Sequence, residues 1–143
     1  MTFQPEQLHA LVRYRMDQAH ETVREAKILL DQDAWRGATN RAYYAMFYAV
    51  LALMATRQLS ASKHSGVLAL FDREFVKPGL LPRTLSRLLR LAFNRRQRYD
   101  YGEIVEPDHQ GAREMLDDAG TFVNAVDEFL RSEGYLGASE SAL

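Results

Sequence analysis

The 143-residue sequence contains no cysteine, which excludes disulfide bonds, thiolate metal sites and cysteine nucleophiles together. It also lacks an apolar run of the roughly 20 residues that a membrane span needs. The most apolar stretch, Ala42–Ala55, is enclosed by Arg41 and Arg57 and is therefore expected to be a core helix. The N-terminal residues lack a basic segment followed by an apolar one, so we expect no secretory signal, no membrane association and a cytoplasmic location.

The net charge is also small, because the sequence contains 18 lysine and arginine residues and 19 acidic residues. A formal net charge of −1 and a pI near 6.4 give no reason to expect attraction of the whole molecule to nucleic acid. Binding of that kind needs a local basic patch. One candidate exists, since six arginines fall between positions 83 and 98, whereas acidic residues dominate from Glu103 onward.

The composition is that of a globular protein, with 47% apolar and 26% charged residues. A chain of this length falls within the usual size of one domain and can bury a core without metal or disulfide support. We therefore expect a single domain over residues 1–134. The small, polar residues 135–143 are expected to form a flexible C-terminal tail.

Apolar residues recur at steps of three and four in five stretches, which is the spacing of amphipathic helices. The first predicted helix begins at Pro5 and ends near Asp31, and the second follows a cap at Asp33 and ends near Arg57. Three further helices are predicted: a shorter one marked by Val67, Leu70, Phe71 and Phe75, one that begins at Pro82, and one that begins at Pro107.

No stretch alternates with a period of two, and the connections are short, so the sequence predicts an all-α fold, a five-helix and mostly antiparallel bundle. The second helix is apolar nearly all round and belongs at the centre of that bundle. Tyr44 and Tyr48 lie off its Tyr43–Phe47 face. Because a small bundle cannot easily cover so much apolar surface, we expect a homodimer.

Three carboxylate-x-x-His spacings occur, at Glu6–His9, Asp17–His20 and Glu106–His109. Pairs on different helices can hold a dinuclear metal. Here two pairs lie on one helix, and no inward-facing glutamates complete a ligand set, so we expect no metal site and no cofactor. The scattered single glycines also form no phosphate-binding loop.

Four segments follow one another in an order and at a spacing that resemble the HEPN domain family, in particular its small stand-alone branch: "RAYYAMFYAVLAL", "KHSGVLALFDREFVKPGLL", "RRQRYDYGE" and "AGTFVNAVDEFL". The most specific pieces are the A-Y-Y-A-x-F core, the His-x-x-Val segment, and the Arg-x-x-x-Asp-Tyr of Arg96, Asp100 and Tyr101. The resemblance covers residues 18–130. It implies an all-α fold of four to five helices that is often dimeric.

The resemblance also implies a function. Members of this branch are commonly encoded beside a minimal nucleotidyltransferase and bind it as the toxin half of a toxin–antitoxin pair. The active branches are metal-independent ribonucleases in which an arginine is followed, after four to six residues, by a histidine. Here Tyr101 occupies the place of that histidine after Arg96, and a tyrosine with a pKa near 10 is a poor general base at neutral pH.

We therefore interpret the protein as a HEPN-type bundle that binds a nucleotidyltransferase and a nucleotide or RNA. A second interpretation is a ribonuclease with catalytic residues Arg96, Asp100 and Tyr101. A third is a structural helix end without a site. The predicted groove for the nucleotide, RNA or protein partner is lined by Arg95, Arg98, Tyr44 and Tyr48.

One literal arginine–histidine spacing exists, with six residues between Arg57 and His64. It spans the loop between the second and third predicted helices, where the resemblance does not place a catalytic motif. We interpret the spacing as coincidence and His64 as a helix-start or packing residue.

Overall fold

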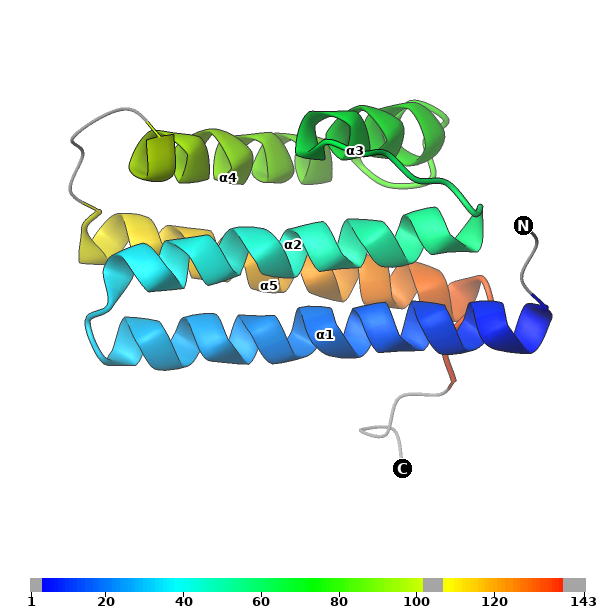
Figure 1. Ribbon diagram of the computed structural model, residues 1–143, viewed down its shortest axis with the longest axis horizontal. Helices are drawn as coiled ribbons and strands as arrows, with labels where there is room; N and C mark the ends of the chain where they lie inside the picture. The colour runs from blue at the N-terminus through cyan, green and yellow to red at the C-terminus, as the bar shows by residue number, and fades with distance from the viewer. Residues whose placement is uncertain (1–3, 102–106, 138–143) are drawn as a thin grey trace.

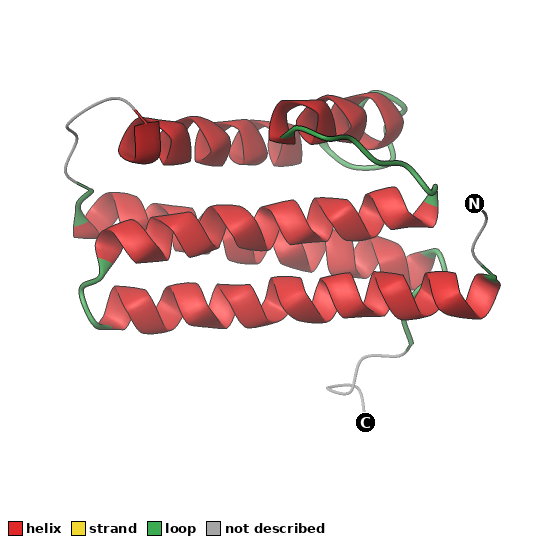
Figure 2. Ribbon diagram, in the orientation of Figure 1, coloured by secondary structure: helices red, strands yellow, loops and turns green. Residues whose placement is uncertain are grey.

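The structure of the protein, a computed structural model, describes residues 4–101 and 107–137, apart from the side chains of Asp100 and Tyr101. The described residues contain five α-helices: α1 (Pro5–Asp31), α2 (Trp35–Thr56), α3 (His64–Phe71), α4 (Arg83–Tyr101) and α5 (His109–Ser132). A short π-helical segment, η1 (Asp72–Val76), follows α3 directly. The described residues form no strand (Figure 2). The predicted all-α bundle is confirmed.

The helices form two layers (Figure 1). The long helices α1, α2 and α5 pack against one another, and α3 and α4 lie end to end along the other side of α2. Helix α2 contacts all four other α-helices, so the prediction that it lies at the centre is correct. Its position brings α3 and α4, which are separated by η1 and a turn, onto one face of a single helix.

Short side chains explain the close packing around α2. Five alanines on this helix are fully buried and recur at steps of three and four: Ala38, Ala42, Ala45, Ala49 and Ala52. Helices that present such small residues can approach closely, and the pair with the most extensive backbone approach is α1 and α2. Larger side chains of α2 are also fully buried, among them Tyr43, whose ring lies near those of His64 on α3 and Phe93 on α4.

Three predicted helix starts differ from the structure by one or two residues. Asp33 has a φ of 58° and does not cap α2, whose N-cap is Ala34. Helix α4 begins one residue after Pro82. Helix α5 begins two residues after Pro107, because the Asp108 side chain caps it by accepting a hydrogen bond from the backbone N–H of Gly111 (2.7 Å). Propensity alone does not show which of several polar residues caps a helix.

The segment predicted as the end of the third helix is the π-helical η1, which is anchored to α4. The Ser86 hydroxyl donates to a carboxylate oxygen of Asp72 (2.6 Å), and Arg90 forms an ion pair with the other oxygen. Phe75 of η1 is buried. The following turn contains Gly79 with a φ of 86°, a conformation that favours glycine, and reverses the chain into α4.

The C-terminal end of the described chain returns to the bundle. The Tyr135 ring lies 5.2 Å from the His9 ring, and its hydroxyl donates to the carbonyl of Thr56 (3.5 Å). The tail predicted for residues 135–143 lies mostly outside the described residues, so the domain boundary stays a prediction. Within the described part of the chain, every helix is too short or too polar to cross a bilayer.

The buried alanines generate a prediction for Ala49→Leu. The added isobutyl group has no space between closely packed helices, so we expect the free energy of unfolding to fall by about 1–3 kcal/mol. Urea denaturation measures this change. The control Ala69→Leu adds the same group at an exposed position of α3 and should change stability by less than about 0.5 kcal/mol. Equal midpoints for the two variants would contradict the packing described here.

Candidate functional site

The arginine that the sequence singles out lies on the inner face of α4. Leu85, Leu89 and Ala92 are buried at steps of four and three, and Arg96 continues this stripe by one further step of four. Its guanidinium carbon lies 5.4 Å from the ring centroid of Tyr43 and 5.1 Å from that of Tyr44, both on α2. Arg96 is therefore held against two aromatic rings by cation–π contacts.

Another arginine fixes the end of α4 over the start of α2. Arg36 donates from its guanidinium to the backbone carbonyl of Tyr99 (2.9 Å) and lies 5.9 Å from the ring centroid of that residue. A cation at the carbonyl end of a helix is favourable, because the last carbonyls lack partners within the helix. This contact orients the turn of α4 that carries Arg96.

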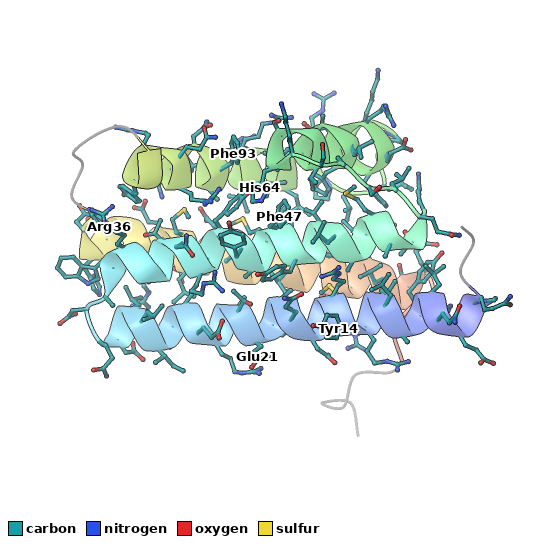
Figure 3. All side chains as sticks on the ribbon, viewed as in Figure 1. Tyr14, Glu21, Arg36, Phe47, His64 and Phe93 are labelled. Carbon is teal, nitrogen blue, oxygen red and sulfur yellow. The ribbon has the colours of Figure 1, made fainter. Side chains whose placement is uncertain are left out.

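His64, the first residue of α3, completes the cluster. Its Nδ1 lies 2.9 Å from the hydroxyl oxygen of Tyr43, and its ring stacks on Phe47 with centroids 4.1 Å apart. Figure 3 shows His64 between Phe93 of α4 and Phe47 of α2. Three elements that are distant in the sequence therefore converge on one histidine.

These side chains border a pocket of about 330 Å³ between the start of α3 and the last turns of α4. The residues that line it are Lys63, His64, Ser65, Phe93, Arg96 and Gln97. Two cations, one hydroxyl, one amide and two rings thus surround a space that is large enough for a small anionic group. The combination suits a phosphate with an attached planar base, because cations bind the phosphate and rings stack on the base.

Burial sets the protonation states in this cluster. It lowers the pKa of His64, and the positive charge of Arg96 lowers it further. Burial also raises the pKa of Tyr43, which Arg96 only partly opposes. At neutral pH His64 is therefore an uncharged imidazole and Tyr43 an uncharged phenol. The positive charge of the pocket comes from Lys63 and Arg96.

The structure brings together some of the predicted groove residues and separates others. Tyr44 contacts Arg96, and Tyr48 lies one turn farther along α2 with its ring 5.9 Å from that of Tyr44. Arg95 points toward α5 instead and pairs with Glu114 (3.4 Å). Arg98 is exposed. The side chains of Asp100 and Tyr101 lie outside the described residues.

Sequence reasoning missed Tyr43, Lys63 and His64 as site residues. The available signal was that a buried tyrosine needs a hydrogen-bond partner for its hydroxyl, and a histidine in a segment typical of the family could supply it. Arg57, which the spacing linked to His64, lies elsewhere. It pairs with Glu74 (3.3 Å) and lies 4.7 Å from the ring centroid of Phe75.

The histidines considered as metal ligands have other neighbours. His20 lies 2.8 Å from a carboxylate oxygen of Asp127 on α5, and His9 packs on Tyr135. Residues 4–101 and 107–137 contain no group of three or more histidine and acidic side chains placed to hold an ion.

The lowered pKa of His64 predicts a pH dependence of stability. Between that lowered value and the ordinary value near 6.5, the unfolded chain binds a proton that the folded chain does not. The stability associated with neutral His64 is complete above about pH 6.5 and is lost as the pH falls through the folded pKa. We expect the free energy of unfolding, measured by urea denaturation, to fall from about pH 7 to about pH 5, and to fall less in His64→Gln.

The matched control is His109→Gln, which changes an exposed histidine at the start of α5. Its pH dependence should equal that of the wild type. Identical pH dependence for His64→Gln and the wild type would contradict the assignment of His64 as a partly buried, neutral imidazole.

The sequence is similar to known proteins over most of its length. The sequence profile of the HEPN domain matches residues 12–129. A "UPF0332 protein" of Thermotoga maritima is 39% identical over 120 residues, which cover 84% of this chain and 91% of that protein. Two proteins of Methanocaldococcus jannaschii, each named "putative toxin", are both 32% identical. Their matches cover 85% and 88% of this chain, and 82% and 90% of the two relatives.

The matched region begins within α1 and ends within α5, so it includes every helix that forms the pocket. A profile match over most of the chain and relatives above 30% identity over most of their own length are sufficient to assign a family. The chain belongs to the HEPN domain family.

Proposed function

We propose that the protein is a toxin-type HEPN protein that binds a minimal nucleotidyltransferase and takes a nucleotide or RNA phosphate into the pocket at Arg96. The main support for this proposal is that the Arg96 guanidinium lies over two tyrosine rings at a pocket that Lys63 also lines. The names of the two Methanocaldococcus relatives support the toxin role. The pairing with a nucleotidyltransferase follows the resemblance to the stand-alone branch of the family.

We also propose that the protein is a cytoplasmic homodimer built from one domain. Support comes from α2, where Tyr44, Tyr48 and Leu51 are only partly buried although they pack against the core. These residues share one side of the helix, because they are spaced by three and four positions. A second copy placed on this side would cover them and would bring two Arg96 pockets near one interface.

Arg96→Ala tests the proposed pocket. A charged hydrogen bond contributes about 1.5–3 kcal/mol, so we expect binding of a mononucleotide such as AMP to weaken by about that amount while the helical circular dichroism spectrum is retained. Isothermal titration calorimetry measures the loss. The control Arg24→Ala removes an exposed arginine from α1 and should leave binding unchanged. Unaltered binding by Arg96→Ala would remove the pocket from the functional assignment.

A ribonuclease is the second candidate function, and the position of His64 favours it. When Nδ1–H donates to the Tyr43 hydroxyl, Nε2 keeps its lone pair. Nε2 could then accept the proton of an RNA 2′-hydroxyl as that oxygen attacks the adjacent phosphorus. The 5′-oxygen would leave with a proton from water, and a 2′,3′-cyclic phosphate would form. Arg96 would stabilise the charge on the phosphoryl oxygens.

Incubation with RNA in excess chelator tests this candidate. We expect wild-type protein to release fragments with 2′,3′-cyclic phosphate ends, and His64→Gln to reduce the rate by on the order of 100-fold or more, because general-base catalysis contributes that much. Tyr101→Phe distinguishes a contribution of the tyrosine at the usual histidine position. Intact RNA after incubation with wild-type protein would exclude this candidate and leave binding as the function.

A further inference from the structure

Positive charge is concentrated in one layer of the molecule. Residues 63–98, which include α3, η1 and most of α4, carry nine of the 18 lysine and arginine residues but only two of the 19 acidic ones. The remaining nine basic residues are therefore outnumbered by seventeen acidic residues. The layer of α3 and α4 in Figure 1 is basic, although the whole chain has a net charge of −1.

A cavity lies in this basic layer, separate from the pocket at Arg96. It has a volume of about 430 Å³ and is lined by Asp72, Val76, Lys77, Arg83, Ser86 and Arg87. The Asp72 carboxylate is already engaged by Ser86 and Arg90. The three cations that line the cavity, Lys77, Arg83 and Arg87, are exposed and make no ion pair with a described carboxylate. Their charge is available to an external anion.

The cavity and the Arg96 pocket lie on the same side of α4. Ser86, Arg90, Phe93 and Gln97 recur at steps of four, three and four residues, which places them in one row along the helix. Ser86 lines the cavity, and Phe93 and Gln97 line the pocket. Seven residues separate Ser86 from Phe93, so the two hollows are about 10 Å apart along the helix axis.

We propose that this row is the path of a single RNA strand, whose phosphates contact Lys77, Arg83 and Arg87 when one nucleotide occupies the Arg96 pocket. The proposal rests on the proposed function and identifies the ligand as a polymer instead of a mononucleotide. The axial separation is about three times the roughly 3.4 Å between successive nucleotides of one strand in a duplex, so a short oligonucleotide is long enough to reach both hollows. A mononucleotide reaches only the pocket, whereas a longer strand reaches both hollows.

The chemistry of the row favours RNA over a protein partner. The centres of protein interfaces are enriched in aromatic side chains and depleted of charged residues overall, although arginine is tolerated there. The cavity offers three long cations and one aliphatic side chain, Val76, but no ring. Repeated cations without ion pairs suit a polyanion, and the aromatic groups that stack on a base lie only at the pocket end, where Phe93 is found.

Binding measurements on Lys77→Gln/Arg83→Gln/Arg87→Gln test the proposal. The probes are AMP and an unstructured nine-nucleotide RNA with 2′-O-methyl groups, which cannot be cleaved through the 2′-oxygen. We expect wild-type protein to bind the nonamer more tightly than AMP. The triple variant should bind the nonamer on the order of 10–100-fold more weakly and AMP equally well. The slope of log K against log salt should decrease by about 2, because each lost single-strand phosphate contact contributes about 0.7.

The matched control is Arg13→Gln/Arg24→Gln/Lys27→Gln, which removes three exposed cations from α1, on the opposite side of the molecule from α4 (Figure 1). It has the same net charge as the test variant and should retain nonamer affinity and salt dependence. Equal nonamer binding by the two triple variants would overturn the proposal, even if AMP binding confirms the pocket. Loss of nonamer binding without any AMP binding by wild type would support the path and reject the pocket.

A third measurement separates RNA from the protein partner. Co-purification with the co-expressed nucleotidyltransferase should be the same for the test and control variants. If the test variant loses the nucleotidyltransferase but retains the nonamer, the row is a protein interface and the proposal is wrong. Thermal melts of all variants should coincide, because the substituted cations are exposed and, with one exception, make no ion pair within the described bundle. The exception is Lys27 in the control, and its ion pair with Asp31 is itself exposed.

Discussion

The arrangement of the candidate site depends on one buried phenol. Tyr43 is fully buried on the central helix, and a buried hydroxyl without a hydrogen bond costs on the order of 1–3 kcal/mol. His64 satisfies it and is thereby fixed at the start of α3, on the ring of Phe47. The face of the Tyr43 ring carries the Arg96 guanidinium from α4. A single side chain of α2 thus positions the histidine and the arginine that border the pocket.

The packing of α2 makes this position of Tyr43 possible. Its five buried alanines leave room for neighbouring helices to approach closely. The aromatic residues of α2 then remain for the side that faces α3 and α4. The distribution of alanines and aromatic residues along α2 therefore supports both the helix packing and the aromatic side of the site. A substitution that shifts α2 by a fraction of an ångström would move Tyr43 and, with it, its neighbours His64 and Arg96.

The sequence predicts the helices and the central place of α2 because these follow from local periodicity, which packing here reinforces. It also predicts Arg96 as a candidate site residue, because a cluster of arginines at the end of an apolar stripe is unusual. It does not predict the contact of His64 with Tyr43, because residues 21 positions apart in different helices meet only through tertiary packing. For the same reason the spacing of Arg57 and His64 is uninformative: Arg57 lies beside Glu74 and Phe75. The sequence does not predict the π-helical turn either, because a change to i→i+5 hydrogen bonds over only five residues hardly alters the spacing of the apolar residues.

Helix α4 shows how one element serves packing and charge at once. The stripe of buried residues on its inner face is continued by Arg96, which occupies a position where the pattern would otherwise place an apolar residue. The Arg96 guanidinium contacts the rings of Tyr43 and Tyr44. A charged group is tolerated there because delocalised guanidinium is weakly hydrated and stacks well on aromatic faces. Its exposed face carries arginines that make little contribution to packing. The leucines and the alanine of the inner stripe supply the packing of α4, so its outer face can carry charges that the fold does not require. Repulsion among these like charges opposes compact folding unless a bound anion offsets it.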